Sequence, residues 1–263
     1  MILENNGIIT DDNYYQDREY ITSSMVKASL QGSKKKFDHI MGEREPTESM
    51  LVGSAFHAMM LEPDKYHELF AFEPNMDRRT KAGKEYIAEW KEENKDVPHH
   101  LPGKYEEMLL NMKESLECHP KYKELINDPR KGEREVIKLF ELEGEKCKAK
   151  VDYYDPKNNF ILDIKTCSSV NLDDIVESIK KYAYGVQAAF YLDGLKAHKF
   201  YFAFIEKKAP YDVVIVDFVS GLENSRNAYK AGIKNIKAFR NLDTLNKVDG
   251  INYYSMFNKI VTM

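Results

Sequence analysis

The chain has 263 residues, and its 39 lysines and arginines against 43 aspartates and glutamates leave a net charge of −4. With 43% hydrophobic and 12% aromatic residues, the composition excludes disordered, collagen-like and low-complexity proteins, because it supplies enough apolar material for a core. No run approaches the roughly 20 apolar residues that a membrane helix needs, and the acidic start does not resemble a secretory leader. We therefore expect a cytoplasmic protein that does not bind a membrane.

Cysteine content and charge narrow the class further. The three cysteines stand at wide spacings, at positions 118, 147 and 167, so neither a disulfide framework nor a zinc ribbon is expected. The mild acidity argues against a simple nucleic-acid binder, which usually has a large positive excess. An enzyme that gathers carboxylates around a metal can nevertheless be acidic overall and carry local basic strips.

The first 130 residues are expected to be mainly helical. Pro63 should end the third predicted helix, because proline disrupts a helix interior. The predicted helices cover residues 23–30, 33–41, 49–61, 80–95 and 103–119, with Ser23 or Ser24 as the cap of the first.

From residue 132 the sequence alternates polar and apolar residues. Turn signals at 143–144 and 155–159 divide the first part of this region into three consecutive antiparallel strands. A helical pair should follow over 171–197, then two strands separated by Pro210, a long helix over 221–241 and an edge strand in the tail 251–263. This order predicts an α/β domain with a mixed central sheet flanked by helices. We expect residues 1–263 to form a single domain, with a mainly helical part over 1–130, a sheet core over 131–220, and a C-terminal helix and tail over 221–263.

Two acids and a lysine are expected to converge in the second and third strands. Asp163 and Lys165 are two residues apart, so their side chains share one face of a strand, and the preceding turn brings Asp152 beside them. Neighbouring carboxylates repel each other unless a divalent cation neutralises them, and oxygen ligands suit Mg²⁺ or Mn²⁺. The lysine can orient or deprotonate an attacking water and stabilise charge on a phosphate. A surface salt bridge in a hairpin is the alternative interpretation.

Three further residues are candidates for the same site. His57 lies in the otherwise apolar segment VGSAFHAMML, where its imidazole must be hydrogen-bonded or bind a metal. Gln187 and Tyr191 are four residues apart, so they share a face of the helix that follows the third strand. A core histidine and an ordinary polar helix edge are the alternatives for these positions.

The blocks around these residues resemble a known superfamily. His57, Asp152, the tripeptide Asp163-Ile164-Lys165 and the pair Gln187 and Tyr191 stand in the order found in PD-(D/E)xK nucleases, which have a restriction-endonuclease-like core. Among these the chain is most similar to the RecE-type 5′→3′ exonuclease, also called exodeoxyribonuclease VIII, of phage and prophage recombination. The similarity covers about residues 22–220, through the blocks EPTESMLVGSAFHAMMLEP, NMDRRTKAGK, KCKAKVDYY, FILDIKTCSS and YGVQAAFYLDG. Val151 departs from the proline of the superfamily's name, and lysines stand at positions 148 and 150 where arginine is more familiar.

The resemblance implies a role for each of these positions. Lys165 would act on the attacking water, while Gln187 and Tyr191 would position the scissile phosphate or support Lys165. Mg²⁺ is the implied cofactor, with Mn²⁺ as a substitute. Glu135, on the first strand, is a weaker candidate for an outer metal contact, and a solvated strand-face charge is an equally good interpretation of it. The implied metal ligands are His57, Asp152, Asp163 and the main-chain carbonyl of Ile164.

Two basic regions are candidates for DNA contacts. The resemblance marks the first, Arg78, Arg79, Lys81 and Lys84, as a DNA or 5′-phosphate contact. The second lies on the late helix, where one face carries Arg226, Lys230, Lys234, Lys237 and Arg240. Such strips can follow a phosphate backbone and make binding salt-dependent, although a solvated helix face is the more common cause.

The resemblance thus predicts a Mg²⁺-dependent exonuclease that enters at a duplex end, degrades the 5′-ended strand and leaves a 3′ single-stranded tail for recombination. It also implies a homo-oligomeric ring, with a tetramer favoured, and a single-strand annealing protein as partner. A restriction-type endonuclease is one alternative. A repair nuclease without an iron–sulfur cluster is the second, because relatives that hold such a cluster use four cysteines, which three widely spaced cysteines cannot supply. A DNA-binding relative without catalytic activity is the third alternative.

Overall fold

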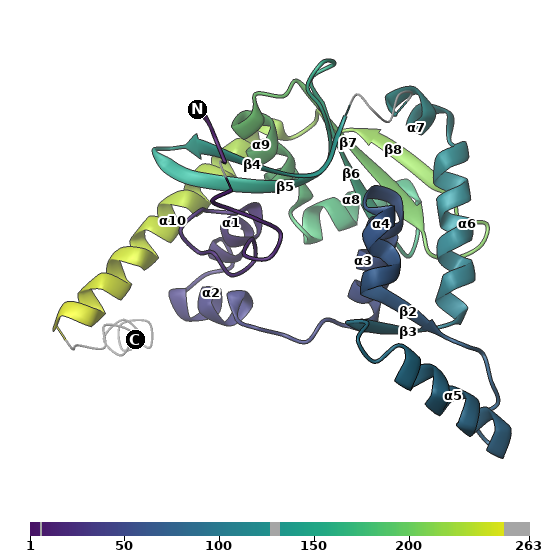
Figure 1. The fold of residues 1–263 in the computed structure, drawn as a ribbon. Helices are drawn as coiled ribbons and strands as arrows, with labels where there is room; N and C mark the ends of the chain where they lie inside the picture. The colour runs from purple at the N-terminus through teal and green to yellow at the C-terminus, as the bar shows by residue number, and fades with distance from the viewer. Residues whose placement is uncertain (6, 127–131, 250–263) are drawn as a thin grey trace.

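A six-stranded mixed sheet organises the computed structural model (Figure 1). The structure describes residues 1–5, 7–126 and 132–249, and of residues 244–249 only the backbone. The strand order is β1-β4-β5-β6-β7-β8, and every pair is antiparallel except β6 with β7. This confirms the predicted α/β class with a mixed sheet. The strands are β1 (Ile2–Leu3), β4 (Glu133–Leu142), β5 (Glu145–Asp155), β6 (Phe160–Cys167), β7 (Lys199–Glu206) and β8 (Val213–Asp217).

Strands β4, β5 and β6 form the predicted antiparallel meander. Glu143 and Gly144 connect β4 to β5 with positive φ angles of 52° and 73°, as a tight two-residue hairpin turn requires. In the second turn the Asp155 carboxylate accepts two main-chain N–H groups, which is the turn chemistry typical of aspartate. These two turns fix the register of the three strands and therefore the face to which each side chain points.

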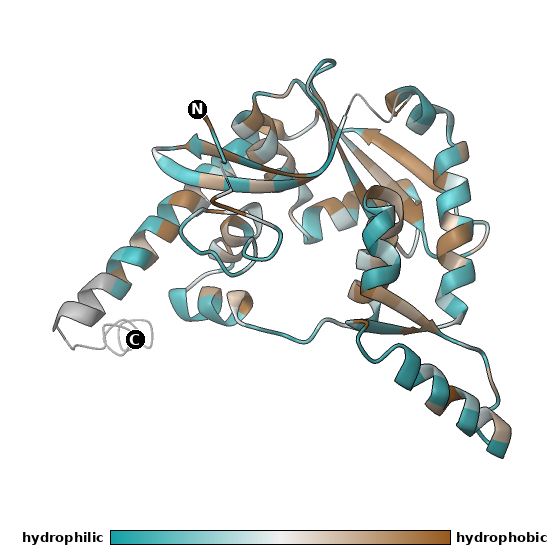
Figure 2. Cartoon of the chain, viewed as in Figure 1, coloured by the Kyte–Doolittle hydropathy of each residue, from teal (hydrophilic) through white to brown (hydrophobic). Residues whose placement is uncertain are grey.

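Helices cover both faces of the sheet and create two cores. One core surrounds Phe140, Phe190 and Phe202, and the other surrounds Phe56 and Met112, all of which are buried. Figure 2 shows hydrophobic residues concentrated in β8 and the neighbouring strands, whereas α5 is mostly hydrophilic. The covering helices are α1 (Ser23–Ser29), α9 (Tyr184–Leu195) and α10 (Leu222–Asp249) for the first core, and α3 (Glu48–Leu61) and α6 (Lys104–Cys118) for the second.

The N-terminal part is helical as predicted, with two corrections. Thr22 caps α1, because its side chain accepts the Met25 N–H, and neither Ser23 nor Ser24 has this role. The second correction is a parallel pair of strands, β2 and β3, within the region predicted to be helical. Each of these strands has only four residues and neither alternates polar with apolar residues, so the sequence carries no strand signal there. The other elements of this part are α2 (Lys34–Met41), α4 (Pro63–Leu69), β2 (Phe70–Glu73), α5 (Lys81–Glu93), β3 (His99–Pro102) and α7 (Pro120–Leu125).

The elements after β6 follow the predicted order. The helical pair consists of α8 (Leu172–Lys181) and α9, and the chain turns between them at Ala183, which has a φ of 50°. The late helix α10 continues to Asp249, eight residues beyond its predicted end at 241. The edge strand predicted for 251–263 lies outside the described residues. Among the residues described, no helix combines the length and the apolar character that crossing a bilayer requires.

Candidate active site

Asp152 lies where the ladder between β5 and β6 ends. Main-chain pairing stops at Tyr153 and Leu162, and at the next step the Asp152 Oδ2 atom accepts the Ile164 N–H at 2.8 Å. A carboxylate thus replaces a backbone carbonyl as the acceptor. Its position is fixed at the point where the two strands separate, beside the main chain of Ile164.

Glu135 faces Asp152 from the neighbouring strand β4. The register pairs the residues on either side of Glu135 with Tyr153 and Val151, and the pair between them is skipped. Glu135 has a φ of 45°, a left-handed conformation that costs a non-glycine residue about 1–3 kcal/mol. The ladder is therefore interrupted at the point where two carboxylates meet across the strands.

His57 completes a group of three side chains that can bind a metal. Its Nδ1 atom lies 3.5 Å from the Asp152 Oδ2 atom. One ligand atom from each of His57, Glu135 and Asp152 lies within 4.8 Å of the other two. The His57 side chain is 27% exposed, so it is not enclosed in the apolar core that its sequence neighbours suggest.

Asp163 and Lys165 form an ion pair beside this group. The Asp163 side chain is buried, and its Oδ1 atom accepts the Gln187 Nε2 amide at 2.5 Å. Gln187 therefore supports the acid that pairs with Lys165. Asp163 is not one of the three residues whose ligand atoms lie together, and its carboxylate contacts Gln187 and Lys165.

Burial and mutual repulsion change the acidity of the three possible ligands. Burial, followed by the charge of Asp163, raises the pKa of Asp152 to about 7. The pKa of Glu135 also rises to about 7, because of burial and then the charge of Asp152. Burial and the Lys165 charge lower the pKa of His57, which leaves a neutral imidazole with a lone pair for a metal. The group as a whole lacks positive charge.

Lys165 remains a cation in this environment. Burial opposes its charge, but the charges of Asp163 and Asp152 outweigh burial and raise its pKa above the ordinary lysine value. The ammonium also lies 5.1 Å from the centre of the Tyr184 ring, an arrangement that favours the charged form. Of the two predicted roles, the fixed positive charge fits these surroundings better than that of a base.

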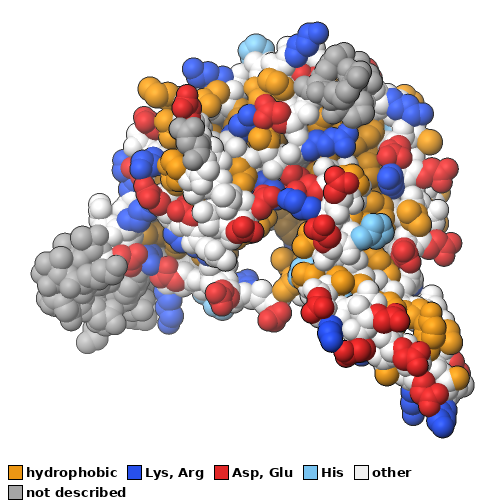
Figure 3. All heavy atoms as spheres, in the orientation of Figure 1, with side chains coloured by type: hydrophobic (Ala, Val, Ile, Leu, Met, Phe, Trp, Pro, Cys, Tyr) orange, Lys and Arg blue, Asp and Glu red, His pale blue; other side chains and the backbone are white. Residues whose placement is uncertain are grey.

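His57, Glu135, Asp152 and Lys165 line an open cleft of about 670 Å³, whereas Asp163 and Gln187 are not among its lining residues. Figure 3 shows a hollow on one face of the molecule, between α1 and α2 on one side and α3 on the other, with acidic and basic side chains on its rim. Within the cleft the side chains of His57, Asp152 and Glu135 keep 27%, 13% and 14% of their surface exposed to solvent. The walls of the cleft include Tyr15, Gly53, Glu62, Lys150, Tyr184 and Lys207.

Residues 22–251 match the model of a protein family described as a PDDEXK-like domain of unknown function (DUF3799). The chain belongs to this family. The match places it in the PD-(D/E)xK superfamily that its motifs predicted. It does not distinguish the RecE type within that superfamily, which stays a prediction.

One solved structure agrees with the fold of this PDDEXK-like chain. A protein from Eubacterium rectale, provisionally assigned as an exonuclease, is 18% identical and superposes with a TM-score of 0.64 over 89% of this chain and 86% of its own. A phage-related exonuclease from Haemophilus somnus is 15% identical over 68% of this chain and 93% of its own, with a TM-score of 0.35. The second likeness is too loose to support an argument. No curated protein matches the chain.

Tyr191 does not line the cleft of the PDDEXK-like domain. Its side chain is buried, and its hydroxyl donates to the Lys150 carbonyl at 3.3 Å. This placement does not bring Tyr191 to a phosphate in the cleft. Instead it holds the main chain of β5 two residues before Asp152.

The predicted DNA contacts at 78–84 project away from the cleft. They lead into α5, which extends from the body beyond β2 and β3 (Figure 1). Their charge is partly balanced within the same segment, through the pairs Arg78 with Glu73, Arg79 with Asp77 and Lys81 with Glu85. None of Arg78, Arg79, Lys81 and Lys84 lines the cleft.

The basic face of α10 pairs with acids of the chain itself. Arg226 makes a bidentate contact with Asp193 at 3.0 Å, and Lys237 lies 3.0 Å from Glu145. Arg240 contacts the same glutamate at 3.3 Å. The intramolecular contacts favour a packed helix face over a path for a phosphate backbone.

Three of the residues that line the cleft were undervalued or missed in the sequence. Glu135 was only a weak candidate, and Lys150, whose Nζ atom lies 3.0 Å from the Glu135 carboxylate, was noted only as a departure from the superfamily. The signal for the lysine was the alternation of Lys148, Lys150 and Asp152, because residues two apart on a strand share one face. Tyr184 precedes Gln187 by three residues and carried no separate signal.

Proposed function

We propose that this chain is a divalent-metal-dependent deoxyribonuclease that digests duplex DNA from its ends in the 5′→3′ direction. One observation carries the proposal. His57, Glu135 and Asp152 offer three ligand atoms within 4.8 Å of one another, next to the ion pair of Asp163 and Lys165. Acids, imidazole and lysine in one open cleft are the residue types that metal-assisted phosphodiester hydrolysis requires.

The donor set fits a hard divalent cation. Carboxylate oxygens suit Mg²⁺ and Mn²⁺, and a neutral imidazole is an acceptable additional ligand. Burial, followed by repulsion between carboxylates, raises the pKa values of Asp152 and Glu135, and a bound cation would offset that repulsion. His57, Glu135 and Asp152 would hold it, with Asp163 and the Ile164 carbonyl added by the resemblance. A bound cation supplies Lewis acidity toward water and phosphate oxygens.

Lys165 contributes a fixed positive charge beside the reacting phosphate. Its ammonium stays protonated at neutral pH because Asp163 and Asp152 stabilise it, so it can stabilise the negative charge that develops on the phosphate in the transition state. Gln187 is a positioning residue, since its amide holds the Asp163 carboxylate. Lys150 balances part of the Glu135 charge from the opposite side.

Finer features of the proposal rest on the resemblance. They are Mg²⁺ as the cofactor with Mn²⁺ as a substitute, 3′ tails as the product for recombination, a homo-oligomeric ring with a tetramer favoured, and a single-strand annealing protein as partner. The provisional assignment of the Eubacterium rectale protein as an exonuclease points in the same direction. Arg78, Arg79, Lys81 and Lys84 are the proposed DNA contacts outside the cleft.

The decisive experiment is digestion of linear duplex DNA labelled at its 5′ or its 3′ ends, alongside a covalently closed circle. Reactions contain Mg²⁺, Mn²⁺ or EDTA. We expect metal-dependent loss of the 5′ label while the circle stays intact.

Other outcomes would change the proposal. Cutting of the circle would indicate an endonuclease on the same fold. DNA binding without cleavage under any metal would indicate a catalytically inactive relative. Cleavage in EDTA would contradict the metal mechanism itself.

A further inference from the structure

Tyr15 is an exposed aromatic side chain at the edge of the cleft. It is 73% exposed, compared with 50% for Tyr182 and 49% for Tyr86. It lines the cleft of the proposed active site and also a second pocket of about 150 Å³, and Lys150 lines both as well. The ring therefore stands at the border between the two cavities, next to the strand that carries Asp152.

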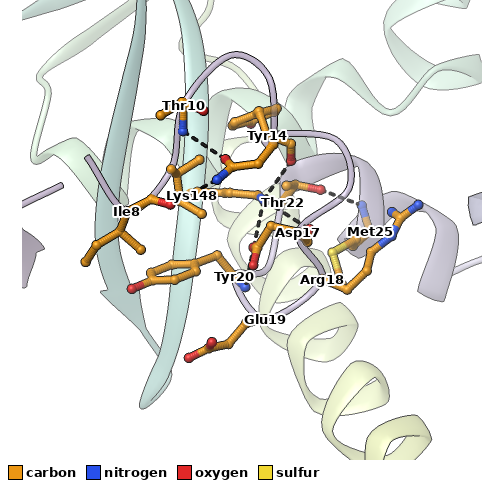
Figure 4. A network of polar contacts seen from close by, with 12 residues as sticks. Ile8, Thr10, Tyr14, Asp17, Arg18, Glu19, Tyr20, Thr22, Met25 and Lys148 are labelled. Atoms are coloured by element: carbon orange, nitrogen blue, oxygen red, sulfur yellow. Dashed lines mark hydrogen bonds and ion pairs between the residues drawn. The ribbon is translucent and has the colours of Figure 1, made fainter. Parts of the chain in front are cut away.

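A buried lysine fixes the loop that carries Tyr15. Lys148 is 0% exposed, and its ammonium donates to the Tyr14 carbonyl at 2.7 Å, the Asp17 carbonyl at 3.0 Å and the Asp17 carboxylate at 2.8 Å. Figure 4 shows this side chain reaching from β5 between Tyr14 and Asp17. Its three N–H donors are matched by three acceptors. Because an unpaired buried charge is very costly, the loop is held firmly where these acceptors surround the ammonium.

Tyr14 gives the loop a second attachment to β5. Its hydroxyl accepts the Lys150 N–H at 2.9 Å, and its ring meets the Tyr15 ring edge to face with 5.1 Å between the centroids. Farther along the segment, the Ile21 N–H donates to the Lys146 carbonyl at 2.9 Å. The main chain around Tyr15 is anchored while its ring remains in solvent.

A firmly held aromatic ring in solvent has a free face for a flat partner. Every nucleobase has such a face, so stacking on an aromatic side chain tolerates any sequence. That tolerance suits an enzyme that removes nucleotides one after another regardless of sequence. A side chain on an ordered loop also loses less conformational freedom on binding than one on a mobile loop.

We propose that Tyr15 stacks on the nucleobase next to the phosphodiester bound in the cleft, held in position by the Lys148 contacts to its loop. This inference rests on the proposed nuclease function and adds a base contact to it. Tyr15 thereby sets how far the strand enters the cleft, because the base rests against a ring that β5 itself positions.

A fluorescent base tests the stacking contact. Short duplexes carry 2-aminopurine at the 5′-terminal position, and Ca²⁺ replaces Mg²⁺, with gel analysis to verify that the DNA stays intact. We expect the wild-type protein to quench the 2-aminopurine fluorescence. Tyr15→Ala should lose the quenching and bind the duplex about 5- to 150-fold more weakly, whereas Tyr15→Phe should retain most of the affinity. Leu110→Ala on α6 is the control, because it removes an exposed apolar side chain that lies outside both the cleft and the predicted DNA contacts at 78–84.

The outcomes separate the two proposals. If wild-type protein neither binds nor cleaves the duplex in any metal, the nuclease function fails and the stacking contact fails with it. If the wild type binds and cleaves while Tyr15→Ala quenches and binds like the wild type, the stacking contact alone is wrong. Equal losses in Tyr15→Ala and Leu110→Ala would also contradict it, since the effect would then not belong to the cleft. Thermal melting of each variant verifies that it is folded.

Discussion

Two charged residues on the polar face of β5, Lys148 and Asp152, have opposite surroundings. Lys148 and Asp152 lie four residues apart on the same face of the strand. The lysine has a carboxylate and two carbonyls around its ammonium. The aspartate faces a second carboxylate, Glu135, and its pKa is raised to about 7.

This difference distinguishes Lys148, whose charge stabilises the fold, from Asp152, whose charge is available to a ligand. Around Lys148 every donor has an acceptor, so no ligand could improve the arrangement, and the loop it holds is part of the fold. Around Asp152 the negative charges outnumber the nearby positive ones, and either a bound proton or a bound metal cation relieves this imbalance. The folded state carries the cost of that imbalance, as functional sites commonly do.

The largest expected effect follows from a substitution of Asp152, the residue of β5 that lies in the proposed active site. Asp152→Asn removes one of the repelling charges and keeps an oxygen that can accept the Ile164 N–H. We expect a loss of nuclease activity on the order of 10³-fold, without a lower melting temperature in EDTA. The labelled-duplex digestion and a thermal melt measure both. Activity near the wild-type level would remove Asp152 from the proposed site.

A substitution of Lys148, the buried lysine of β5, should affect stability instead. Lys148→Met leaves the buried Tyr14 carbonyl and the partly buried Asp17 carbonyl without their donor and removes one donor from the Asp17 carboxylate. We expect the free energy of unfolding to fall by about 1–3 kcal/mol, measured by urea denaturation. Lys146→Met is the control on the same strand, because Lys146 is 56% exposed and pairs with Glu19 at the surface. Its cost should be at most about 1 kcal/mol, and equal costs for the two variants would contradict the role of burial.

A smaller effect links pH, metal and stability. The pKa values of Asp152 and Glu135 are higher in the folded protein than in the unfolded chain, so the folded state holds more protons between about pH 4 and 7. The metal-free protein should therefore lose stability from these groups as pH rises through that range. Mn²⁺ should raise the melting temperature by about 5 °C at pH 8 and less at pH 5.5, where protons compete.

Calorimetric melts with and without Mn²⁺ at the two pH values test this link. Asp152→Asn serves as the comparison, because it removes one of the two coupled carboxylates and should lose most of the gain at pH 8. A gain of equal size at both pH values would show that the metal binds elsewhere.

The smallest expected effect concerns Arg79, one of the predicted DNA contacts at 78–84 outside the cleft. Arg79→Ala should reduce DNA affinity modestly and lower the slope of log affinity against log salt by about one, if its guanidinium contacts a phosphate. Arg79 is already paired with Asp77 at the surface, so the net loss should be small. Lys113→Ala on α6 is a comparable exposed substitution outside the predicted strip. An unchanged slope for Arg79→Ala would mean that the charges at 78–84 serve only their own segment.

The sheet was predictable because its signals are local. Glu143-Gly144 and the turn after Asp155 mark the ends of the strands, and alternation marks their faces, so the approach of Asp152 to Asp163 and Lys165 followed from the sequence. His57 was recognisable as a polar residue in an apolar helix. The order of these residues in turn supported the superfamily, which the family match confirmed.

Features that depend on pairing between distant segments were not predictable. Glu135 joins the site because the β4–β5 register brings it opposite Asp152 and because its backbone is left-handed, and neither property is encoded by its neighbours. The position of Tyr15 depends on acceptors in its loop closing around Lys148, more than 130 residues later in the chain. For Tyr191 a local signal was misleading. Its helical spacing from Gln187 suggested a place in the site, but its hydroxyl donates to the Lys150 carbonyl.

The parallel pairing of β2 with β3 restricts how α5 can be altered. Phe70 pairs with His99 and Glu73 with Pro102 in the same direction, and parallel neighbours cannot be joined by a tight turn because the chain must return along their length. Helix α5 therefore belongs to the connection that returns the chain to the start of β3, and it also extends from the body of the molecule. A shortened version has to keep a connection of about a dozen residues. Lengthening α5 leaves this topology unchanged. Replacing α5 by a hairpin turn would require β2 and β3 to pair antiparallel.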